Sequence, residues 1–266
     1  GQTIFHNAKE KISKQLGDGK LLSMLAKKTV IYDFRQNDLK NGGQGAPLTP
    51  IFHKLLKIKF RIKNTTFINI GGIVNITSIS NENKMSGTDV GPGMCLIDRW
   101  VRQKSKKKYD ENGIICKSGK VNKKGLDQLL ENFNEKENNL SKGIIQSFDT
   151  KYFDFSFIKN LSLEDGAATL MEFTAQVITL ALKSRGKFND KIILCGGGRK
   201  NSFLVEKLKK ENSNIQLIDQ FGVDGDFVES QAFGYLAIRS YLNLAISFPE
   251  TTNVKKPCKG GITIKY

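Results

Sequence analysis

The segment "KIILCGGGRKNSFLVEKLKKE", Lys191 to Glu211, constrains the fold of this chain more than any other. A short apolar, β-branched run leads into the glycines at Gly196 to Gly198, and an amphipathic stretch follows. This order predicts a buried strand, a tight loop and a helix. Bare N–H groups in such a loop lie at the positive end of a helix dipole, which favours phosphate. A tight structural turn is the alternative, because the segment matches neither G-x-G-x-x-G nor G-x-x-x-x-G-K-[ST].

A second glycine turn lies in "FINIGGIVNIT", Phe67 to Thr77, where Gly71 and Gly72 separate two β-branched runs. This pattern predicts two strands joined by a hairpin. Glycine pairs are also common in ordinary two-residue turns, so a structural turn is the alternative here as well. Two glycine-lined turns in one chain could face one another and clamp a polyphosphate, with Asn75 just beyond the first.

Strand and helix patterns alternate along the rest of the chain, which predicts an α/β architecture. The run "VIYDF" is typical of a strand, and residues 35–50 form a predicted Gly- and Pro-rich loop. A basic connector follows and ends near Asn64, where a shift in composition makes the best candidate domain boundary. Residues 162–186 and 226–245 carry apolar side chains at helical spacing and are predicted helices. The first of them begins with the capping-box pattern "SLED".

The segment "SGTDVGPGMCLIDRW" places Asp89 among Gly87, Gly91, Pro92 and Gly93. This composition predicts a turn in which the carboxylate is exposed and rigidly held. With a pKa near the ordinary value of about 3.9, it would be ionised at neutral pH. It could then act as a general base or hold a metal ion. The alternative is a turn-forming aspartate that hydrogen-bonds its own backbone.

The charge balance raises the question of an anionic partner, because 42 Lys and Arg face 26 Asp and Glu, a net charge of +16. Such a balance can signal nucleic acid or an anionic membrane. The densest basic run, Val101 to Asp110, contains a single aromatic residue that could stack on a base. A solvated loop is therefore the preferred interpretation. No apolar run is long enough to span a bilayer.

The four cysteines lie far apart, at positions 95, 116, 195 and 258, and their spacing supports neither a zinc site nor a disulfide framework. The two histidines are too few for a histidine metal cluster. A reduced chain in the cytoplasm is the simplest interpretation. The start, "GQTIFHNAKE", lacks the pattern of a signal peptide and begins with Gly rather than Met, which suggests a fragment or a processed chain.

Taken in order, a set of segments resembles the anhydro-N-acetylmuramic acid kinase family, part of the actin-like, sugar-kinase and Hsp70 ATPase superfamily. The segments are "GQTIFH", "DFRQNDLKNGGQGAPLTP", "NIGGIVNIT", "GTDVGPGMCLIDRW", "DGAATLMEFTA", "LCGGGRKNSFL", "VESQAFGYLA" and "FPETT". They run from Gly1 nearly to Tyr266. The resemblance implies a two-lobed actin-like (ribonuclease H-like) ATPase fold with an incomplete first lobe, because the family's initial strand and Gly/Ser/Thr-rich phosphate loop are expected before this start. Residues 1–64 would be the remainder of the N-terminal lobe with the sugar-binding segment, and residues 65–266 the second lobe with the nucleotide loops and the catalytic aspartate.

The family phosphorylates 1,6-anhydro-N-acetylmuramic acid with ATP while water opens the anhydro ring, which gives N-acetylmuramic acid 6-phosphate in bacterial cell-wall recycling. The resemblance therefore implies a cytoplasmic kinase that uses ATP and Mg²⁺, acts on an amino sugar, binds neither nucleic acid nor membrane, and can form a homodimer. Two other hypotheses stay open. One is an actin-like kinase for a different sugar, and the other is an inactive, truncated remnant that only binds a ligand.

The same resemblance implies roles for individual residues. Asp89 would take a proton from the water that attacks the anomeric carbon, and Glu229 would help to position that water. The family's proline-rich segment before the long helix corresponds here to "IIQSFDTKYFDF", residues 144–155, which lacks the prolines. No magnesium ligand is predicted. The implied substrate-binding residues are Thr3, Arg35, Asp38, Gly45, Ala46 and Pro47, and the implied nucleotide-binding residues are Gly71, Gly72, Asn75, Gly196, Gly197, Gly198 and Asn201.

Overall fold

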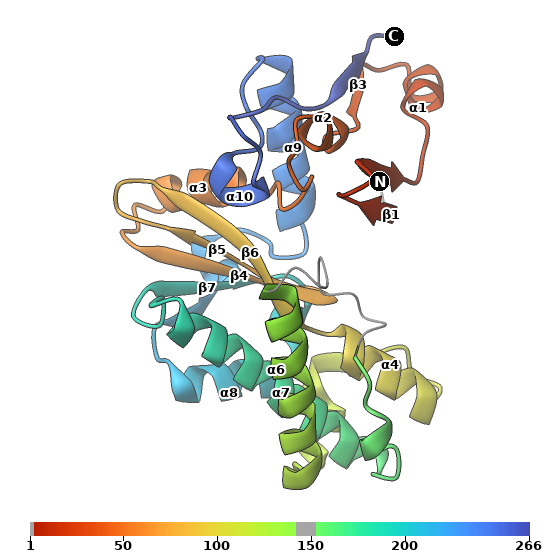
Figure 1. Cartoon of the computed structure of the whole chain (residues 1–266), viewed down its shortest axis with the longest axis vertical. Coiled ribbons are helices and arrows are strands. Elements are labelled where there is room, and N and C mark those ends of the chain that lie inside the picture. The colour runs from red at the N-terminus through yellow and green to blue at the C-terminus, as the bar shows by residue number, and fades with distance from the viewer. Residues whose placement is uncertain (1–2, 142–152) are drawn as a thin grey trace. The chain divides into compact units, whose positions relative to one another are not determined.

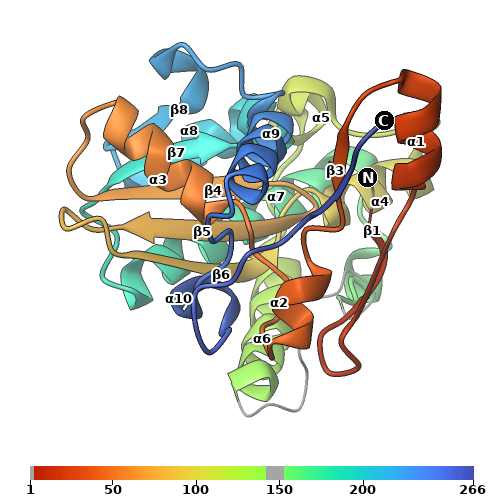
Figure 2. The same cartoon turned by 90° about the horizontal axis from the view of Figure 1, so that it is seen from above.

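The computed structural model describes residues 3–141 and 153–266, apart from the side chains of residues 136–141 (Figure 1, Figure 2). The chain divides into two compact units, and both contain helices and strands, so the predicted α/β class is confirmed. Across the described part of the chain, no helix is both long enough and apolar enough to cross a membrane. Unit 1 consists of Gly1–Lys63, Thr77–Thr88 and Phe227–Tyr266, and unit 2 consists of Asn64–Ile76 and Asp89–Asp226.

The first break between the units falls where the composition of the sequence shifts. Lys63 ends the first part of unit 1, and Asn64 begins unit 2. Two later segments return to unit 1, so the units are interleaved in the sequence. The division into lobes at residues 1–64 and 65–266 stays a prediction. Residues 144–155, which correspond to the family's proline-rich segment, lie mostly outside the described residues, since only residues 153–155 are described.

Most of a five-stranded sheet, in the order β6-β5-β4-β7-β8, belongs to unit 2, whereas the end of β5 and the start of β6 lie in the segment Thr77–Thr88, which is counted with unit 1. Strand β7 pairs in parallel with β4 on one side and with β8 on the other. Its side chains from Ile192 to Cys195 are fully buried, as expected for a central strand of a parallel sheet. The hairpin predicted around the first glycine pair is confirmed by the two strands that flank it. The strands are β4 (Thr65–Ile70), β5 (Ile73–Ile79), β6 (Met85–Pro92), β7 (Lys191–Cys195) and β8 (Ile215–Leu217).

Helix α7 is the longest helix of unit 2 and lies with α4, α6 and α8 on one face of the sheet (Figure 1). Its predicted cap is confirmed, because Ser162 Oγ accepts the N–H of Asp165 at 3.0 Å. The indole of Trp100 is fully buried, and its Nε1 donates to Leu163 O at 2.9 Å. The helices are α4 (Cys95–Lys104), α5 (Ile114–Ser118), α6 (Lys123–Ser141), α7 (Leu163–Ser184) and α8 (Ser202–Glu211), with 3₁₀ turns at η1 (Glu111–Gly113), η3 (Ser156–Ile158), η4 (Gly197–Lys200) and η5 (Ile218–Phe221).

Unit 1 contains two antiparallel strand pairs, β1 with β2 and β3 with β9, and β3 is the strand predicted from "VIYDF". The predicted Gly- and Pro-rich loop is present over residues 41–49 only, because α2 occupies its first part. The prediction of a connector after it is wrong, because α3 lies there. Pro50 starts α3 at a position where the missing N–H has no helical partner, and Phe52 and Leu56 give that helix a buried face. The elements are β1 (Thr3–Asn7), β2 (Ile12–Gln15), α1 (Gly19–Ala26), β3 (Val30–Tyr32), α2 (Gln36–Lys40), α3 (Pro50–Lys59), α9 (Val228–Tyr241), α10 (Pro249–Thr252) and β9 (Ile262–Ile264).

A buried histidine in α3 makes the stability of unit 1 depend on pH. His53 is 3% exposed, and its Nδ1 lies 2.9 Å from Thr77 Oγ1. Burial lowers its pKa from 6.5 to about 4, so between these values the unfolded chain binds more protons than the folded one. The free energy of unfolding should therefore rise by roughly 3 kcal/mol as the pH increases through this window, and should not change further above it through this residue.

Urea unfolding of the wild type and of His53→Gln, measured from pH 4 to pH 8, tests this expectation. The variant should lose most of the rise, because its side chain does not titrate. His6→Gln is the matched control, since it removes the chain's other histidine, which is exposed on β1, and it should keep most of the rise. Parallel curves for the wild type and His53→Gln would contradict the assignment.

Candidate functional site

The two glycine turns leave the sheet of unit 2 at the same end. Strands β4 and β7 run in parallel, and Asn69 of β4 pairs with Cys195 of β7. The turn Gly71–Gly72 follows β4 directly, and the loop Gly196–Gly198 follows β7 directly. Ligands of α/β proteins bind beyond the carboxyl ends of parallel strands. The predicted pair of glycine-lined turns is therefore brought together at the edge where a ligand is expected.

Local structure explains two of the three glycines after β7. Gly196 has a φ of +79°, and a Cβ there would lie 2.7 Å from Ile70 O. A Cβ on Gly198 would lie 2.2 Å from Ile70 Cγ2. Gly197 is exposed, and a Cβ there would meet no described heavy atom within 4 Å. Neither packing nor backbone strain explains this glycine, and its bare backbone leaves room for a ligand to approach.

The hairpin turn is anchored through its carbonyl oxygens. Gly72 O accepts the N–H of Gly93 at 2.9 Å and that of Cys95 at 3.3 Å, while Gly71 O accepts the N–H of Met94 at 2.9 Å. These bonds hold the turn against Cys95, the first residue of α4, and the two residues before it. A Cβ on Gly71 or Gly72 would make only ordinary van der Waals contacts. Like Gly197, these two glycines are not required by the local packing.

The two asparagines predicted to bind nucleotide lie in different settings. Asn201 is buried, and its Oδ1 accepts the N–H of Leu204 at 3.0 Å, which makes it the N-cap of α8. It therefore fixes where α8 begins after the glycine loop. Asn75 lies in β5 and is half-buried.

Asp89 lies in strand β6 and not in the predicted turn. The strand continues through Gly91, whose φ of +158° is an extended backbone, and through Pro92. The carboxyl group is half-buried rather than exposed, and burial raises its pKa above the ordinary 3.8. A carboxylate with a raised pKa is a stronger base than an exposed one, provided that it is ionised.

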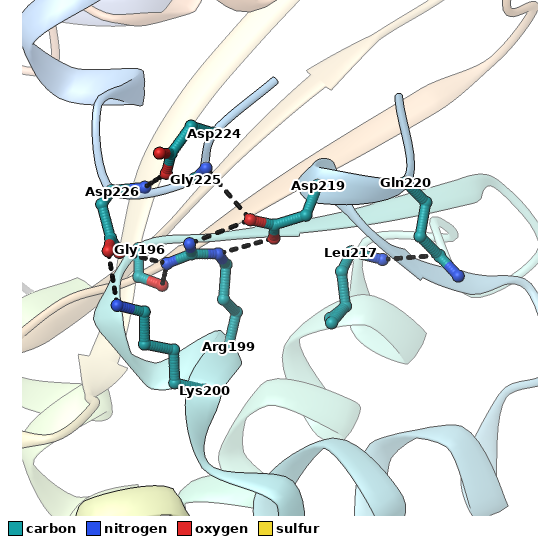
Figure 3. Close-up of polar contacts among 9 residues, drawn as sticks. All are labelled: Gly196, Arg199, Lys200, Leu217, Asp219, Gln220, Asp224, Gly225 and Asp226. Carbon is teal, nitrogen blue, oxygen red and sulfur yellow. Dashed lines mark hydrogen bonds and ion pairs between the residues drawn. The ribbon is translucent and has the colours of Figure 1, made fainter. Parts of the chain in front are cut away.

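An arginine that the sequence analysis did not single out holds the glycine loop (Figure 3). Arg199 is buried, and its guanidinium binds Asp219 through two bonds, Nε to Oδ2 at 2.8 Å and Nη2 to Oδ1 at 3.0 Å. Its Nη1 donates to Asp226 Oδ1 at 2.9 Å and to Gly196 O at 3.1 Å. We call Arg199, Asp219 and Asp226 the arginine clamp. The clamp joins the glycine loop to the segment that contains Asp219 and Asp226.

The clamp leaves its carboxylates ionised well below neutral pH. The hydrogen bonds that Asp219 accepts from Arg199 lower the pKa of Asp219 to about 2. The pKa of Asp226 is also lowered, first by its bond to Lys200 and then by Arg199. Two features of the sequence could have indicated the clamp: Arg199 directly follows the glycines, and Asp226 lies in the later "DGD". Their spacing gives no sign that the two residues bind one another.

In unit 1, the implied sugar-binding residues lie around one loop. Asp38 is buried, and its Oδ1 accepts the N–H of Gly45 while its Oδ2 accepts Thr252 Oγ1, both at 2.6 Å. Arg35 Nη1 donates to Gly45 O at 2.7 Å. Asp38 and Arg35 thus hold Gly45 from both of its peptide groups, and the cis peptide Ala46-Pro47 follows. Through these contacts, Asp38 fixes the conformation of this loop.

The remaining residues implied in unit 1 are exposed. Thr3 lies on β1, and its Oγ1 donates to Gln15 Oε1 at 2.9 Å. Glu229 lies in the first turn of α9. Burial lowers the pKa of Arg35, and the negative charges of Glu229 and Asp38 oppose that shift. Arg35 and Glu229 are therefore close enough in unit 1 to interact electrostatically.

A cavity of about 660 Å³ lies in unit 1 beside Arg35. Polar groups from Ser13, Gln15 and Asp33 line it together with apolar side chains of α1 such as Leu22. Among the implied sugar-binding residues, Arg35 lines this cavity. The cavity residues on α1 were missed because the sequence analysis assigned no structure to residues 19–26.

The implied residues are distributed between the units by role. The implied nucleotide-binding residues and Asp89 all belong to unit 2. The implied sugar-binding residues and Glu229 all belong to unit 1. The resemblance thus implies nucleotide-binding residues in unit 2 and sugar-binding residues in unit 1.

A family model and three relatives that match this chain carry the same description. The family model described as anhydro-N-acetylmuramic acid kinase matches residues 1–265. The anhydro-N-acetylmuramic acid kinase of Pelagibacter ubique (strain HTCC1062) is 54% identical over 275 residues, which cover all of this chain and 72% of the relative. That of Zymomonas mobilis is 38% identical, with 98% of this chain and 70% of the relative covered. That of Methylobacterium nodulans is 34% identical, with 100% and 70% covered.

Among solved structures, the activator of the 2-hydroxyisocaproyl-CoA dehydratase from Clostridium difficile with bound ADPNP is similar with a TM-score of 0.43. The identity is 18%, and the match covers 68% of this chain and 63% of that chain. This degree of likeness is too low to support any conclusion about function.

Two glycine substitutions in the same loop should differ in their effect on the free energy of unfolding. Gly198→Ala forces a Cβ into Ile70, so it should lower the free energy of unfolding by about 1–3 kcal/mol. Gly197→Ala adds a methyl group to open space and should change it by less than about 0.5 kcal/mol. Urea unfolding of both variants measures the difference. If both variants lost the same free energy of unfolding, the two glycines would not differ in packing as described.

Proposed function

The chain belongs to the anhydro-N-acetylmuramic acid kinase family, and from this we propose how its residues phosphorylate 1,6-anhydro-N-acetylmuramic acid at O6 with ATP. Water opens the anhydro ring in the same reaction, and the product is N-acetylmuramic acid 6-phosphate, a step of bacterial cell-wall recycling. The observation that carries this function is the family match over residues 1–265, together with the 54% identity to a relative of that name.

Asp89 is proposed as the general base. It takes a proton from the water whose oxygen forms a bond to the anomeric carbon, and the bond from that carbon to O6 breaks. The freed O6 forms a bond to the γ-phosphorus, and the bond between that phosphorus and ADP breaks. One carboxylate on the water side is sufficient, as in inverting glycoside hydrolysis, because phosphorus captures the departing oxygen. The half-buried setting of Asp89 and its raised pKa support this role.

The glycine turns of unit 2 are proposed to bind the nucleotide. Gly71, Gly72 and Asn75 would line one side of the phosphates, and the loop Gly196–Gly198 with Asn201 would line the other. Their common position at the carboxyl ends of β4 and β7 supports this role, since backbone N–H groups there are suited to anions. Gly197 supports it further, because nothing in the described protein occupies the space beside it.

The sugar is proposed to bind through unit 1. The loop at Gly45, Ala46 and Pro47, held by Arg35 and Asp38, would shape the pocket, with Thr3 as a polar neighbour at the β1 strand. Glu229 would help to position the attacking water. The cavity beside Arg35 supports a small ligand on this unit, and Ser13, Gln15 and Asp33 supply polar groups to its largely apolar wall.

Magnesium is proposed to arrive with ATP. Within the described ranges, no group of three or more His, Cys, Asp or Glu side chains could hold a metal ion. Mg²⁺ usually keeps several waters and binds through nucleotide phosphates with one or two carboxylates, so a dedicated protein cage is not required. When bound, the ion would offset the charge of the phosphates.

The cellular setting is also a proposal. The family's reaction supports a cytoplasmic enzyme with small-molecule partners and no nucleic-acid partner, and the resemblance supports a homodimer. Light scattering on the purified chain would measure its mass in solution. Retention on DNA or RNA that weakens with salt would contradict the absence of a nucleic-acid partner.

Replacing Asp89 with Asn should lower kcat by at least about a hundredfold, because a general base contributes that much or more. ATP binding, measured by calorimetry, should change less than twofold. Product is followed by mass spectrometry of the sugar 6-phosphate. Asp98→Asn is the matched control, because Asp98 on α4 is also a half-buried carboxylate with a pKa raised by burial. Near-normal turnover in Asp89→Asn would remove the proposed base, and a preference for an ordinary hexose would point to a different sugar kinase.

Because the pKa of Asp89 is raised, an increase in pH through that pKa should raise activity and lower stability. The value of kcat/KM should fall on acidification, with a midpoint above the ordinary 3.8. The ionised, desolvated carboxylate destabilises the fold above its folded pKa, so Asp89→Asn should not lower the melting temperature at pH 7. A pH profile of the wild type and thermal unfolding of the variant check both signs. A markedly lower melting temperature for Asp89→Asn at pH 7 would contradict a desolvated carboxylate at Asp89.

A further inference from the structure

The guanidinium of Arg199 binds two carboxylates and a carbonyl oxygen of the protein itself. Its guanidinium donates to Asp219 through Nε and Nη2 and to Asp226 and Gly196 through Nη1. The pKa of this guanidinium is raised, first by its bonds to Asp219. An arginine beside a phosphate-binding loop would be expected to bind phosphate directly, but this one is buried and already bound to two carboxylates. Its contribution must be to the shape of the loop.

The bonds to Gly196 fix the direction of one peptide group. Gly196 O accepts both Arg199 Nη1 at 3.1 Å and the Arg199 N–H at 3.3 Å. In a planar trans peptide the C=O and the following N–H point in opposite directions. The N–H of Gly197 therefore points away from the guanidinium. Because Gly197 is exposed and a Cβ there would meet no described heavy atom within 4 Å, the space beside this residue is open.

The clamp is itself fixed by a second loop. Asp219 Oδ1 also accepts the N–H of Gly225 at 3.2 Å, and a Cβ on Gly225 would lie 2.0 Å from Arg199 Nε. Asp226 is further bound by Lys200 Nζ. The guanidinium is thus enclosed by Asp219, Gly225 and Asp226, and it has little freedom to turn (Figure 3).

We propose that Arg199 is a positioning residue for the nucleotide: the arginine clamp orients the peptide between Gly196 and Gly197 so that the Gly197 N–H is offered to a phosphate of a nucleoside triphosphate. This inference rests on the proposed nucleotide-binding role of the glycine loop. Arg199 does not touch the nucleotide and acts through the backbone. Its loss should weaken ATP binding while the chemical step at saturating ATP is largely kept.

The test compares Arg199→Lys, Arg199→Gln and Asp219→Asn with the wild type in the full chain. All three should raise KM for ATP and its calorimetric Kd at least tenfold, while kcat at saturating ATP changes less than threefold and KM for the sugar is unchanged. Gly225→Ala, which pushes a methyl group into the guanidinium, should have the same effect and serves if an Arg199 variant does not fold. The double variant Arg199→Gln/Asp219→Asn should be no worse than the worse single variant, because the two residues act as a unit.

The matched control is Lys117→Gln. Lys117 forms a 2.7 Å ion pair with Glu206 in the same unit, but both partners are exposed and neither contacts the glycine loop. This variant should leave KM for ATP unchanged. If the clamp variants lower the melting temperature yet bind ATP as the wild type does, the clamp is only a structural ion-pair network, and the inference is overturned.

Gly197→Ala separates failure of the inference from failure of the proposed function. A wild type that does not bind ATP, or a Gly197→Ala variant with an unchanged KM for ATP, would overturn the nucleotide role of the loop and the inference with it. A raised KM for ATP in Gly197→Ala, with no change in the clamp variants, would overturn the inference alone. A raised KM in both supports the clamp as the device that orients this peptide.

Discussion

The parallel pairing of β4 with β7 is the constraint on which the rest of the candidate site depends. Because Asn69 lies opposite Cys195, the two strands end together, and the glycine turns that follow them meet at one edge of the sheet. A shift of one residue in this register would move every side chain of β7 to the opposite face, where it would meet different packing partners. The complete burial of Ile192 to Cys195 makes that shift costly, so the position of the turns is firmly set.

Each glycine turn is anchored by its carbonyl oxygens, but the two anchors differ. The amides of Gly93, Met94 and Cys95, at the start of α4, hold Gly71 and Gly72, whereas the side chain of Arg199 holds Gly196. Anchoring by carbonyls directs the neighbouring amides elsewhere, and amides are the groups that a phosphate needs. The proposed nucleotide site is thus made from backbone, while the proposed chemistry depends on side chains: Asp89 in unit 2 and Glu229 in unit 1.

Local patterns in the sequence predicted much of this structure. The strand, glycine loop and helix around residue 196, the hairpin at Gly71 and the capped helix α7 depend on neighbouring residues, and all three are present. Helix α3 was missed because its basic residues suggested a connector. Asp89 was placed in a turn because glycines surround it, but glycine also permits an extended strand. The arginine clamp was invisible because its carboxylates lie 20 and 27 residues away, a separation that only the fold closes.

The central claim is that ATP binds at the edge where β4 and β7 end. A direct measurement is an NMR titration of the full chain, labelled with ¹⁵N at glycine, with magnesium and a non-hydrolysable ATP analogue. The account predicts that the amide resonances of Gly72 and Gly197 shift as the site fills, while that of Gly186, at the far end of α7, stays in place. Saturable binding of the analogue that leaves the resonances of both turns unmoved would contradict it.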